Sequence, residues 1–227
     1  MSKQPRRTRI KICGIRDVET AQFAFEAGAD AIGLVFYPPS SRAIEVASAQ
    51  EIVCALPSGA LSVALFVNPS TALVRQVLRD VGPSILQFHG DEPPAFCGQF
   101  GHPYWKATRV SAGTDLGELA TTFRDAKRLL LDAEASANRV TTDATARLYG
   151  GTGELFDWKL IPSILANSIV LSGGLTADNV GEAIRTVRPW AVDVSSGVEA
   201  QRGIKSRTLI QNFIQAVVKE DSREQTV

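Results

Sequence analysis

Residues 10–17, Ile-Lys-Ile-Cys-Gly-Ile-Arg-Asp, open a pattern that recurs along this 227-residue sequence. An apolar run ends at the thiol of Cys13, a glycine follows, and Asp17 can cap the first turn of a helix. The next segment has apolar residues on one helical face and ends at Gly28. Short apolar runs alternate with such helical segments along the chain, which predicts eight strand–helix pairs.

The expected strands are short and rich in apolar or β-branched residues. They are 9–13, 31–36, 61–67, 84–89, 103–109, 128–132, 168–171 and 190–194. The segments between and after them have the period of a helix. They are 18–27, 48–55, 71–80, 94–100, 116–124, 158–166, 177–187 and 207–218. Strands that are apolar on both faces are typical of a parallel sheet covered by helices.

These pairs favour an α/β fold, a single-domain (β/α)8 TIM barrel with parallel strands over 1–227, with 1–8 and 220–227 as flexible tails. A doubly wound open sheet is the alternative. It usually has a glycine-rich turn after its first strand, whereas the glycine-containing loops singled out here follow the sixth, seventh and eighth strands. The connection 133–157 is unusually long. Its first half could be a disordered insertion, and its glycine-rich end resembles a lid hinge.

Charge and cysteine content exclude several classes of protein. The 24 basic and 24 acidic residues give a formal net charge of +0, which argues against nucleic-acid or membrane-surface binding. Cys13, Cys54 and Cys97 are odd in number and lack CxxC spacing, which predicts neither a disulfide framework nor a zinc site. The polar N-terminus lacks the apolar core of a signal peptide, and no apolar run could span a bilayer. We therefore expect a cytoplasmic protein.

Polar residues stand where several expected strands end, and in a barrel these ends form the active face. Asp132 follows three leucines, where a carboxylate is costly to bury unless it is paired or functional. It could act as a general acid or simply cap a helix or loop. Asp193 lies near the end of the eighth strand. Gln87 and His89 share one face at the end of the fourth.

Cys13 has two interpretations. A free cysteine is often a small buried hydrophobe. However, Lys11 shares its strand face and could lower the pKa of the thiol so that it serves as a base. Cys54 and Cys97, inside helical segments, are expected to be packing residues.

Two loops with glycines follow the seventh and eighth strands, Ser-Gly-Gly at 172–174 and Ser-Ser-Gly at 195–197. Barrels frequently hold phosphate between these loops, although tight turns also use glycine. Arg42, on a proline-stiffened loop, could bind a ligand carboxylate or remain solvated. A bound metal is not expected, because His102 is the only histidine besides His89 and precedes the fifth strand.

Seven motifs, in this order, resemble the phosphoribosylanthranilate isomerase family. They are KICG at 11–14, GLVFY at 33–37 with SR at 41–42, QFHGDE at 87–92, LD at 131–132, GGTG at 150–153 with FDW at 156–158, SGGL at 172–175 and DVSSGVE at 193–199. The resemblance runs from about 10 to 213. It departs from the family at Ser206, where an aspartate is usual.

The resemblance implies an enzyme of tryptophan biosynthesis that needs no cofactor. It would convert N-(5-phosphoribosyl)anthranilate into 1-(2-carboxyphenylamino)-1-deoxyribulose 5-phosphate by an Amadori rearrangement, with this small molecule as its partner and a monomer or homodimer as its assembly. By the family pattern Asp132 is the general acid, Cys13 the general base and Arg42 the residue that binds the anthranilate carboxylate. The expected phosphate-binding and further substrate-binding residues are Gly173, Gly174, Ser195, Ser196, Gly197, His89 and Asp193.

Three other functions are weighed against this one. A related histidine-pathway isomerase resembles a doubled half-barrel with an Asp near the start of each half, whereas the first strand here ends in Cys13. A Schiff-base aldolase could use Lys106, but this lysine sits inside an expected strand. A noncatalytic barrel that binds a phosphometabolite would show binding without turnover.

Overall fold

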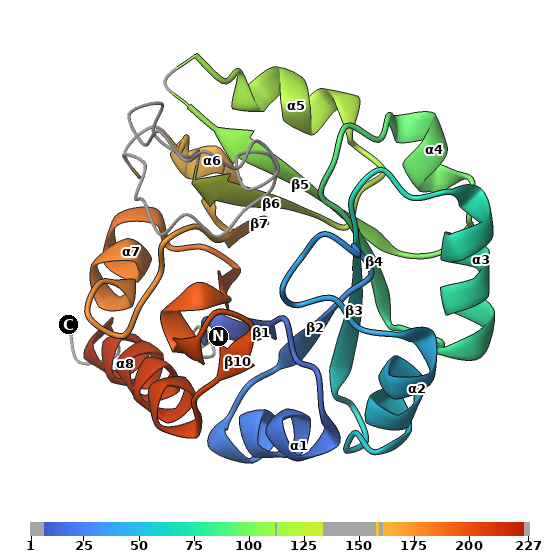
Figure 1. Ribbon diagram of the computed structural model, residues 1–227. Helices are drawn as coiled ribbons and strands as arrows, with labels where there is room; N and C mark the ends of the chain where they lie inside the picture. Colours follow the sequence, from blue (N-terminus) through green and yellow to red (C-terminus); the bar gives the residue numbers. More distant parts are fainter. Residues whose placement is uncertain (1–6, 112, 134–157, 159–160, 225–227) are drawn as a thin grey trace, which may run out of the picture.

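Eight parallel strands close into a barrel with helices on its outside (Figure 1). The computed structural model describes residues 7–111, 113–133, 158 and 161–224. Each strand pairs with the next along the chain, and β8 (Ala191–Val194) pairs back with β1 (Arg9–Cys13). The expected parallel TIM barrel is confirmed. The alternative of a doubly wound open sheet is wrong, because the pairing of β8 with β1 leaves the sheet without a free edge.

All the expected strands and helices occur in the described residues, with some ends shifted. The barrel strands are β1 (Arg9–Cys13), β2 (Ala31–Val35), β3 (Leu61–Phe66), β4 (Ile85–Phe88), β5 (Tyr104–Val110), β6 (Arg128–Ala133), β7 (Ile169–Leu171) and β8 (Ala191–Val194). The helices are α1 (Val18–Ala27), α2 (Val46–Cys54), α3 (Thr71–Asp80), α4 (Pro94–Gly98), α5 (Leu116–Thr122), α6 (Ser163–Ala166), α7 (Val180–Val187) and α8 (Arg207–Glu224). A 3₁₀ turn, η2 (Ser196–Val198), and an antiparallel hairpin, β9 (Glu199–Gln201) with β10 (Ile204–Lys205), separate β8 from α8.

Helix α1 shows how local sequence sets the element ends. The Asp17 carboxylate accepts a hydrogen bond from the Thr20 backbone N–H, and Gly28 ends the helix in the left-handed conformation at φ 114°. Helix α7 instead starts three residues later than expected. The Asn179 side chain accepts from the Thr176 N–H and donates to the Gly174 carbonyl, so residues 176–179 form a separate turn.

The core has an outer and an inner layer. Outward-facing apolar residues of the strands pack under the helices, and the rings of Phe36, Phe66 and Phe88 stack in a row at 5.4 and 6.1 Å between centroids. Inside the barrel, Val63, Trp105 and other apolar residues fill the end at which the strands begin. Polar side chains therefore gather at the opposite end, where the strands finish.

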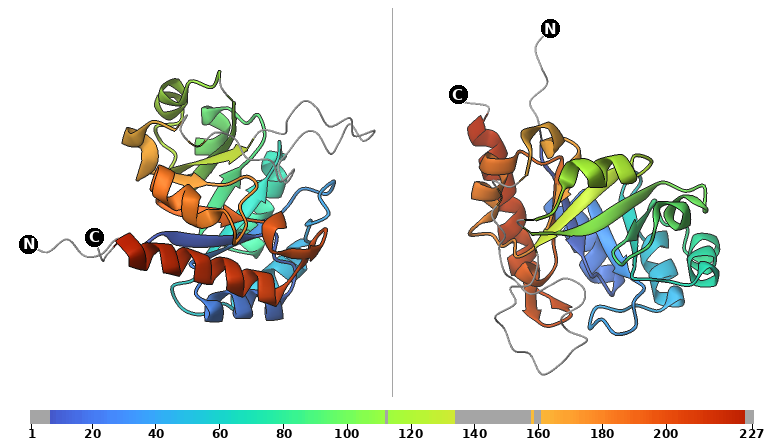
Figure 2. Two further views of the ribbon diagram at one scale, coloured as in Figure 1. Left: turned by 90° about the vertical axis from the view of Figure 1, so that its left-hand side faces the viewer. Right: turned by 90° about the horizontal axis from the view of Figure 1, so that it is seen from above.

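Helix α8 runs along the outside of the barrel between α1 and α7 (Figure 2). It continues to Glu224, and Asp221 near its end accepts hydrogen bonds from the Thr8 backbone N–H and hydroxyl at 2.7 and 2.8 Å. Thr8, Glu220 and Asp221 are buried, so these three residues, which the sequence places in flexible tails, pack against the rest of the structure. Residues 1–6 and 225–227 lie outside the described residues.

The long connection predicted after the sixth strand lies outside the described residues at 134–157, and so does its proposed hinge at 149–153. Of the helix expected over 158–166, the structure gives Ser163–Ala166. None of the described helices is long and apolar enough to cross a membrane.

Candidate active site

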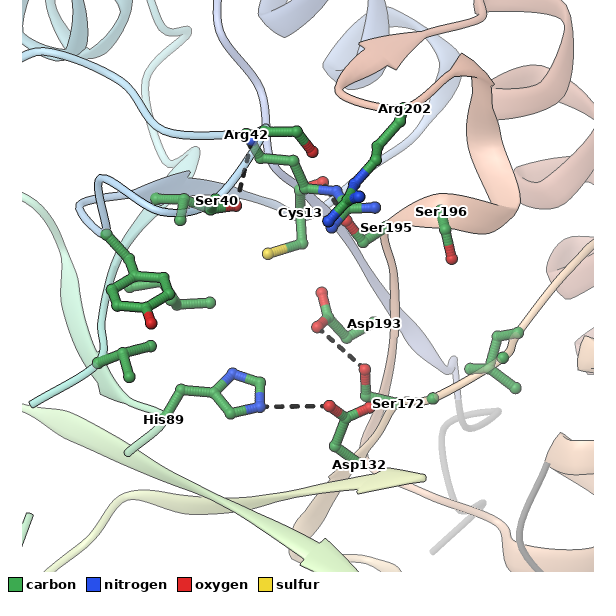
Figure 3. Close-up of a pocket in the computed structure, with 18 of the residues that line it drawn as sticks. Cys13, Ser40, Arg42, His89, Asp132, Ser172, Asp193, Ser195, Ser196 and Arg202 are labelled. Atoms are coloured by element: carbon green, nitrogen blue, oxygen red, sulfur yellow. Dashed lines mark hydrogen bonds and ion pairs between the residues drawn. The ribbon is translucent and has the colours of Figure 1, made fainter. Parts of the chain in front are cut away.

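A cavity of about 400 Å³ lies at the C-terminal ends of the barrel strands, a size suited to a small molecule (Figure 3). Its walls come from strand ends and from the loops after β2, β7 and β8. Of the residues singled out from the sequence, it brings together Cys13, Arg42, His89, Asp132, Gly173, Gly174, Asp193, Ser195 and Ser196. Cys13 and Asp132 enter from different sides of the cavity (Figure 3).

The thiol of Cys13 lies in a buried charged cluster. Lys11, two residues before Cys13 on the same strand face, donates to Asp193 Oδ1 at 2.8 Å, and both side chains are almost fully buried. Burial acts to lower the pKa of Lys11, but Asp193 and Cys13 together raise it above its ordinary value. Lys11 is therefore a fixed cation beneath the thiol.

The expectation that Lys11 lowers the pKa of Cys13 is wrong in its net result. Burial is the largest influence and raises the pKa of the thiol, and the Asp193 carboxylate adds to this. Lys11 and Lys205 act in the opposite direction but do not overcome it. Cys13 is mainly a thiol at neutral pH, and its thiolate, once formed, is a stronger base than an ordinary cysteine.

Asp132 is held by a short chain of hydrogen bonds. Its Oδ2 lies 3.2 Å from His89 Nε2, and His89 Nδ1 lies 3.2 Å from the amide nitrogen of Gln87. Because an amide NH₂ can only donate, His89 accepts at Nδ1 and carries its proton on Nε2, which donates to Asp132. Gln87 and His89 lie on one strand face, as expected, and orient the carboxylate into the cavity.

Two glycines make room for the side chains of Cys13 and Arg42. Gly33 on β2 pairs in register with Cys13, and a Cβ there would lie 2.7 Å from the Cys13 sulfur. Gly14 has φ +84°, and a Cβ on it would lie 2.7 Å from Cδ of Arg42. The side chain of Arg42 therefore crosses directly over Gly14 to reach the cavity.

Arg42 is tied to a carboxylate of this chain. Its Nε and one terminal nitrogen donate to the two oxygens of Glu199 at 2.7 and 2.9 Å. Lys205 also donates to Glu199, at 2.9 Å, and to the Ser195 carbonyl. Burial favours neutral Glu199, but the bonds from Arg42 and Lys205 outweigh it and hold its pKa below the usual range. For Lys205 the balance is the opposite. Burial lowers its pKa by more than the nearby Glu199 carboxylate raises it, so the pKa of Lys205 is below its ordinary value.

The loops after β7 and β8, which the sequence predicts to be an anion cradle, both reach the cavity. Gly173 and Gly174 have φ of 90° and 63°, a left-handed conformation that glycine adopts readily and that lets the backbone come close to a ligand. Ser195 and Ser196 face the same cavity at the start of η2. Gly197 is not among the lining residues. A Cβ on it would collide with the Leu175 carbonyl, so this glycine lets the two loops pack together.

Lys106 and the other cysteines lie away from the cavity. Lys106 faces the helices and donates to Glu92 at 2.8 Å and to the Gly90 carbonyl, which argues against a Schiff-base lysine. Cys97 is buried as expected, whereas Cys54 is exposed, which corrects its assignment as a packing residue. Among the described residues no group of three or more His, Cys, Asp or Glu side chains is arranged to hold a metal ion.

Several residues of the site had no role assigned from the sequence. They are Gly14, Gly33, Gln87, Glu199, Arg202 and Lys205. Glu199 belongs to the motif at 193–199, yet its partner, Arg42, is 157 residues away. Gly33 inside an otherwise apolar strand was the available signal, because such a glycine often marks a close approach.

A parallel barrel with a carboxyl group, a thiol and an anion cradle around one cavity defines an enzyme that moves protons on a phosphorylated small molecule. The comparison with known families agrees with this class. The family model of N-(5'-phosphoribosyl)anthranilate (PRA) isomerase matches residues 10–216, and the chain belongs to this family.

Individual relatives cover nearly the whole chain. The N-(5'-phosphoribosyl)anthranilate isomerase of Dechloromonas aromatica is 51% identical over 95% of this chain and 98% of its own length. The crystal structure of phosphoribosyl anthranilate isomerase from Thermotoga maritima has a TM-score of 0.81 and 39% identity, covering 93% of this chain and 99% of that one. A second solved structure, with bound reduced 1-(o-carboxyphenylamino)-1-deoxyribulose 5-phosphate, has a TM-score of 0.78 and 37% identity at the same coverage.

Proposed function

We propose that this barrel catalyses the Amadori rearrangement of N-(5-phosphoribosyl)anthranilate to 1-(2-carboxyphenylamino)-1-deoxyribulose 5-phosphate, a step of tryptophan biosynthesis. The observation that carries the proposal is the entry of Cys13 and Asp132 into one cavity beside Arg42 and the cradle after β7 and β8 (Figure 3). The reaction needs one group that gives a proton and another that takes one.

Asp132 is the general acid in this mechanism. In its protonated form it gives a proton to the furanose ring oxygen, the bond from this oxygen to C1 breaks, and a protonated Schiff base forms. The hydrogen bond from His89 to Oδ2 fixes which carboxyl oxygen faces away from the substrate. His89 also stabilises the carboxylate that remains after the transfer.

Cys13 is the general base. Its thiolate removes the proton from C2 of the Schiff base, giving an enolamine that tautomerises to the ketone. The raised pKa of the thiol means that few molecules are ionised at neutral pH, but each thiolate is correspondingly basic. Lys11 and Lys205 favour the thiolate and limit the cost of forming it in a buried place.

The remaining residues orient the substrate. Arg42 binds the anthranilate carboxylate with the donors that Glu199 leaves available, and the backbone N–H groups at 173–174 and 195–196 bind the phosphate. Asp193 holds Lys11 and also accepts from the Ser172 hydroxyl at 3.3 Å, which links the thiol cluster to the cradle. A cytoplasmic location and a monomeric or homodimeric state remain part of the proposal.

The test follows the loss of phosphoribosylanthranilate fluorescence on addition of the protein. We expect turnover by the natural chain and a fall in kcat of about 10²–10⁴-fold in Cys13→Ser and in Asp132→Asn, since each removes one proton-transfer group. Circular dichroism and thermal melts check that both variants fold. Full turnover by the two folded variants would overturn the residue roles.

Two outcomes would favour other functions. Tight binding of the substrate without any turnover by the natural chain would favour the noncatalytic barrel. Turnover of the histidine-pathway phosphoribosyl aminoimidazole alone would favour the related isomerase, although the first strand ends in Cys13 where that enzyme would be expected to have a carboxylate.

A further inference from the structure

Most charged side chains of the cavity have a partner among the described residues of this chain, but Arg202 does not. Asp193 holds Lys11, His89 holds Asp132, and Glu199 takes two donors of Arg42. Arg202 also lines the cavity, and in the part of the chain that the structure describes it has neither a carboxylate partner nor a side-chain hydrogen bond. An exposed guanidinium at the wall of a ligand cavity has donors available for an anionic group.

The hairpin that carries Arg202 is anchored on both strands. Glu199, on β9, receives Arg42 and Lys205, and Lys205, on β10, also donates to the Ser195 carbonyl at 2.9 Å. Arg202 is the first residue of the turn between these strands. Its position at the cavity is therefore set by a buried ionic cluster, and only its side chain is left to adjust.

The turn also lies against the loop after β2. Gly203, with φ +81°, packs on the Ser41 carbonyl so closely that a Cβ would collide with it. Ser41 precedes Arg42, so the turn places Arg202 beside Arg42. Figure 3 shows both arginines on the Cys13 and Ser195 side of the cavity, away from His89 and Asp132.

We propose that Arg202 is a second arginine for the carboxylate on the aromatic ring of the substrate. Glu199 occupies two of the donors of Arg42 and offsets its charge, so a carboxylate placed there has fewer partners than a free guanidinium would offer. Arg202 supplies further hydrogen-bond donors from the β9–β10 turn, which packs against the loop that carries Arg42. This role rests on the proposed function and assigns Arg202 to substrate binding rather than to proton transfer.

The test compares Arg202→Gln and Arg202→Lys with the natural chain and with Arg75→Gln, an exposed arginine on α3 that does not line the cavity. Isothermal titration measures the binding of reduced 1-(o-carboxyphenylamino)-1-deoxyribulose 5-phosphate. We expect Arg202→Gln to weaken binding about 10-fold, the loss of roughly one charge-assisted hydrogen bond, and Arg202→Lys to recover part of it. In the same assays Arg75→Gln should match the natural chain.

Two small probes identify the group that Arg202 binds. Competitive inhibition by anthranilate, which carries the carboxylate but no phosphate, should weaken in Arg202→Gln, while inhibition by inorganic phosphate should not change. With the full substrate, KM should rise about 10-fold and kcat should stay within about two-fold, as for a residue that only binds. Unchanged analogue binding, or weaker inhibition by phosphate alone, would overturn the proposal.

Failure of this inference and failure of the proposed function are separable. If the natural chain bound the analogue without turning over the substrate, the proposed function would fall, and analogue binding by Arg202→Gln would still decide the role of Arg202. Normal turnover with equal analogue affinity in the natural chain and Arg202→Gln would remove only the role of Arg202.

Discussion

The sulfur of Cys13 occupies the space beside Gly33 in which any other residue would place its Cβ. That atom would lie 2.7 Å from Sγ and 3.2 Å from Cε of Lys11. Cys13 and Gly33 are register partners on β1 and β2, so neither backbone can move away without breaking the barrel ladder. The glycine thus determines where the thiol points.

Gly33→Ala should therefore cost both stability and activity. We expect a loss of about 1–3 kcal/mol in the free energy of unfolding, as for other overpacked cores, and a fall in kcat because the thiol is displaced. Adding Cys13→Ala should recover part of the stability and none of the activity. Urea unfolding and steady-state kinetics measure the two effects. If Gly33→Ala matched the natural chain in both stability and kcat, the thiol could move aside without cost, which would contradict this prediction.

The pH dependence of kcat/KM should report Cys13 and its charged neighbours. Because the proposed base is the thiolate and the pKa of the thiol is raised, kcat/KM should increase with pH through the alkaline range. Lys205 lowers this pKa, so Lys205→Met should move the rising limb to higher pH. Asp193 raises it, so Asp193→Asn should move the limb to lower pH. Shifts in the same direction, or no shift, would mean that another group titrates.

The sign of the Cys13 shift shows where sequence reasoning ends. Strand alternation correctly placed Lys11 on the face of Cys13, which suggests a lowered pKa. Asp193, which opposes Lys11, is 182 residues from it, and the extent of burial depends on every strand of the barrel. Neither the approach of Asp193 nor the burial of the thiol can be predicted from a local sequence pattern. The strand ends that carry Cys13, His89 and Asp132 were predictable, because periodicity fixes the strands and the barrel fixes their active end.

The buried pair of Glu92 and Lys106 should stabilise the segment that carries His89. Glu92 accepts from the backbone N–H groups of Gly90 and Asn68 as well as from Lys106. Glu92→Gln and Lys106→Met should each cost about 3–5 kcal/mol, since each leaves a buried charge without its partner. The double variant should lose less than the sum, which chemical unfolding of all four proteins would measure. Additive losses would contradict a coupled pair.

The three thiols should react at different rates with a disulfide reagent. Cys54 is exposed and should react first. Cys13 is buried with a raised pKa and should react more slowly, and a bound substrate analogue should protect it further. Burial raises the pKa of Cys97 to about 12, so it should react only on unfolding. Mass spectrometry of labelled peptides gives the order, and rapid labelling of Cys97 would contradict the packing around α4.

The glycines illustrate a second limit of the sequence. The glycine-rich loops after β7 and β8 were predicted as a cradle, and Gly173 and Gly174 line the cavity with positive φ. Gly197 belongs to the same motif but serves the contact with Leu175 instead. A motif shows which residues act together. Which of them contacts a ligand and which contacts a neighbouring loop depends on the packing of elements far apart in the chain.

Glu199 has consequences for how this site can change over evolution. One carboxylate holds Arg42, which we assign to substrate binding, and Lys205, whose charge favours the thiolate of Cys13. The same residue starts the hairpin that carries Arg202. A substitution at Glu199 would therefore alter substrate affinity, base strength and hairpin position together. New specificities in this barrel should arise from paired changes that preserve an anion at this position, and single replacements of Glu199 should be rare among functional variants.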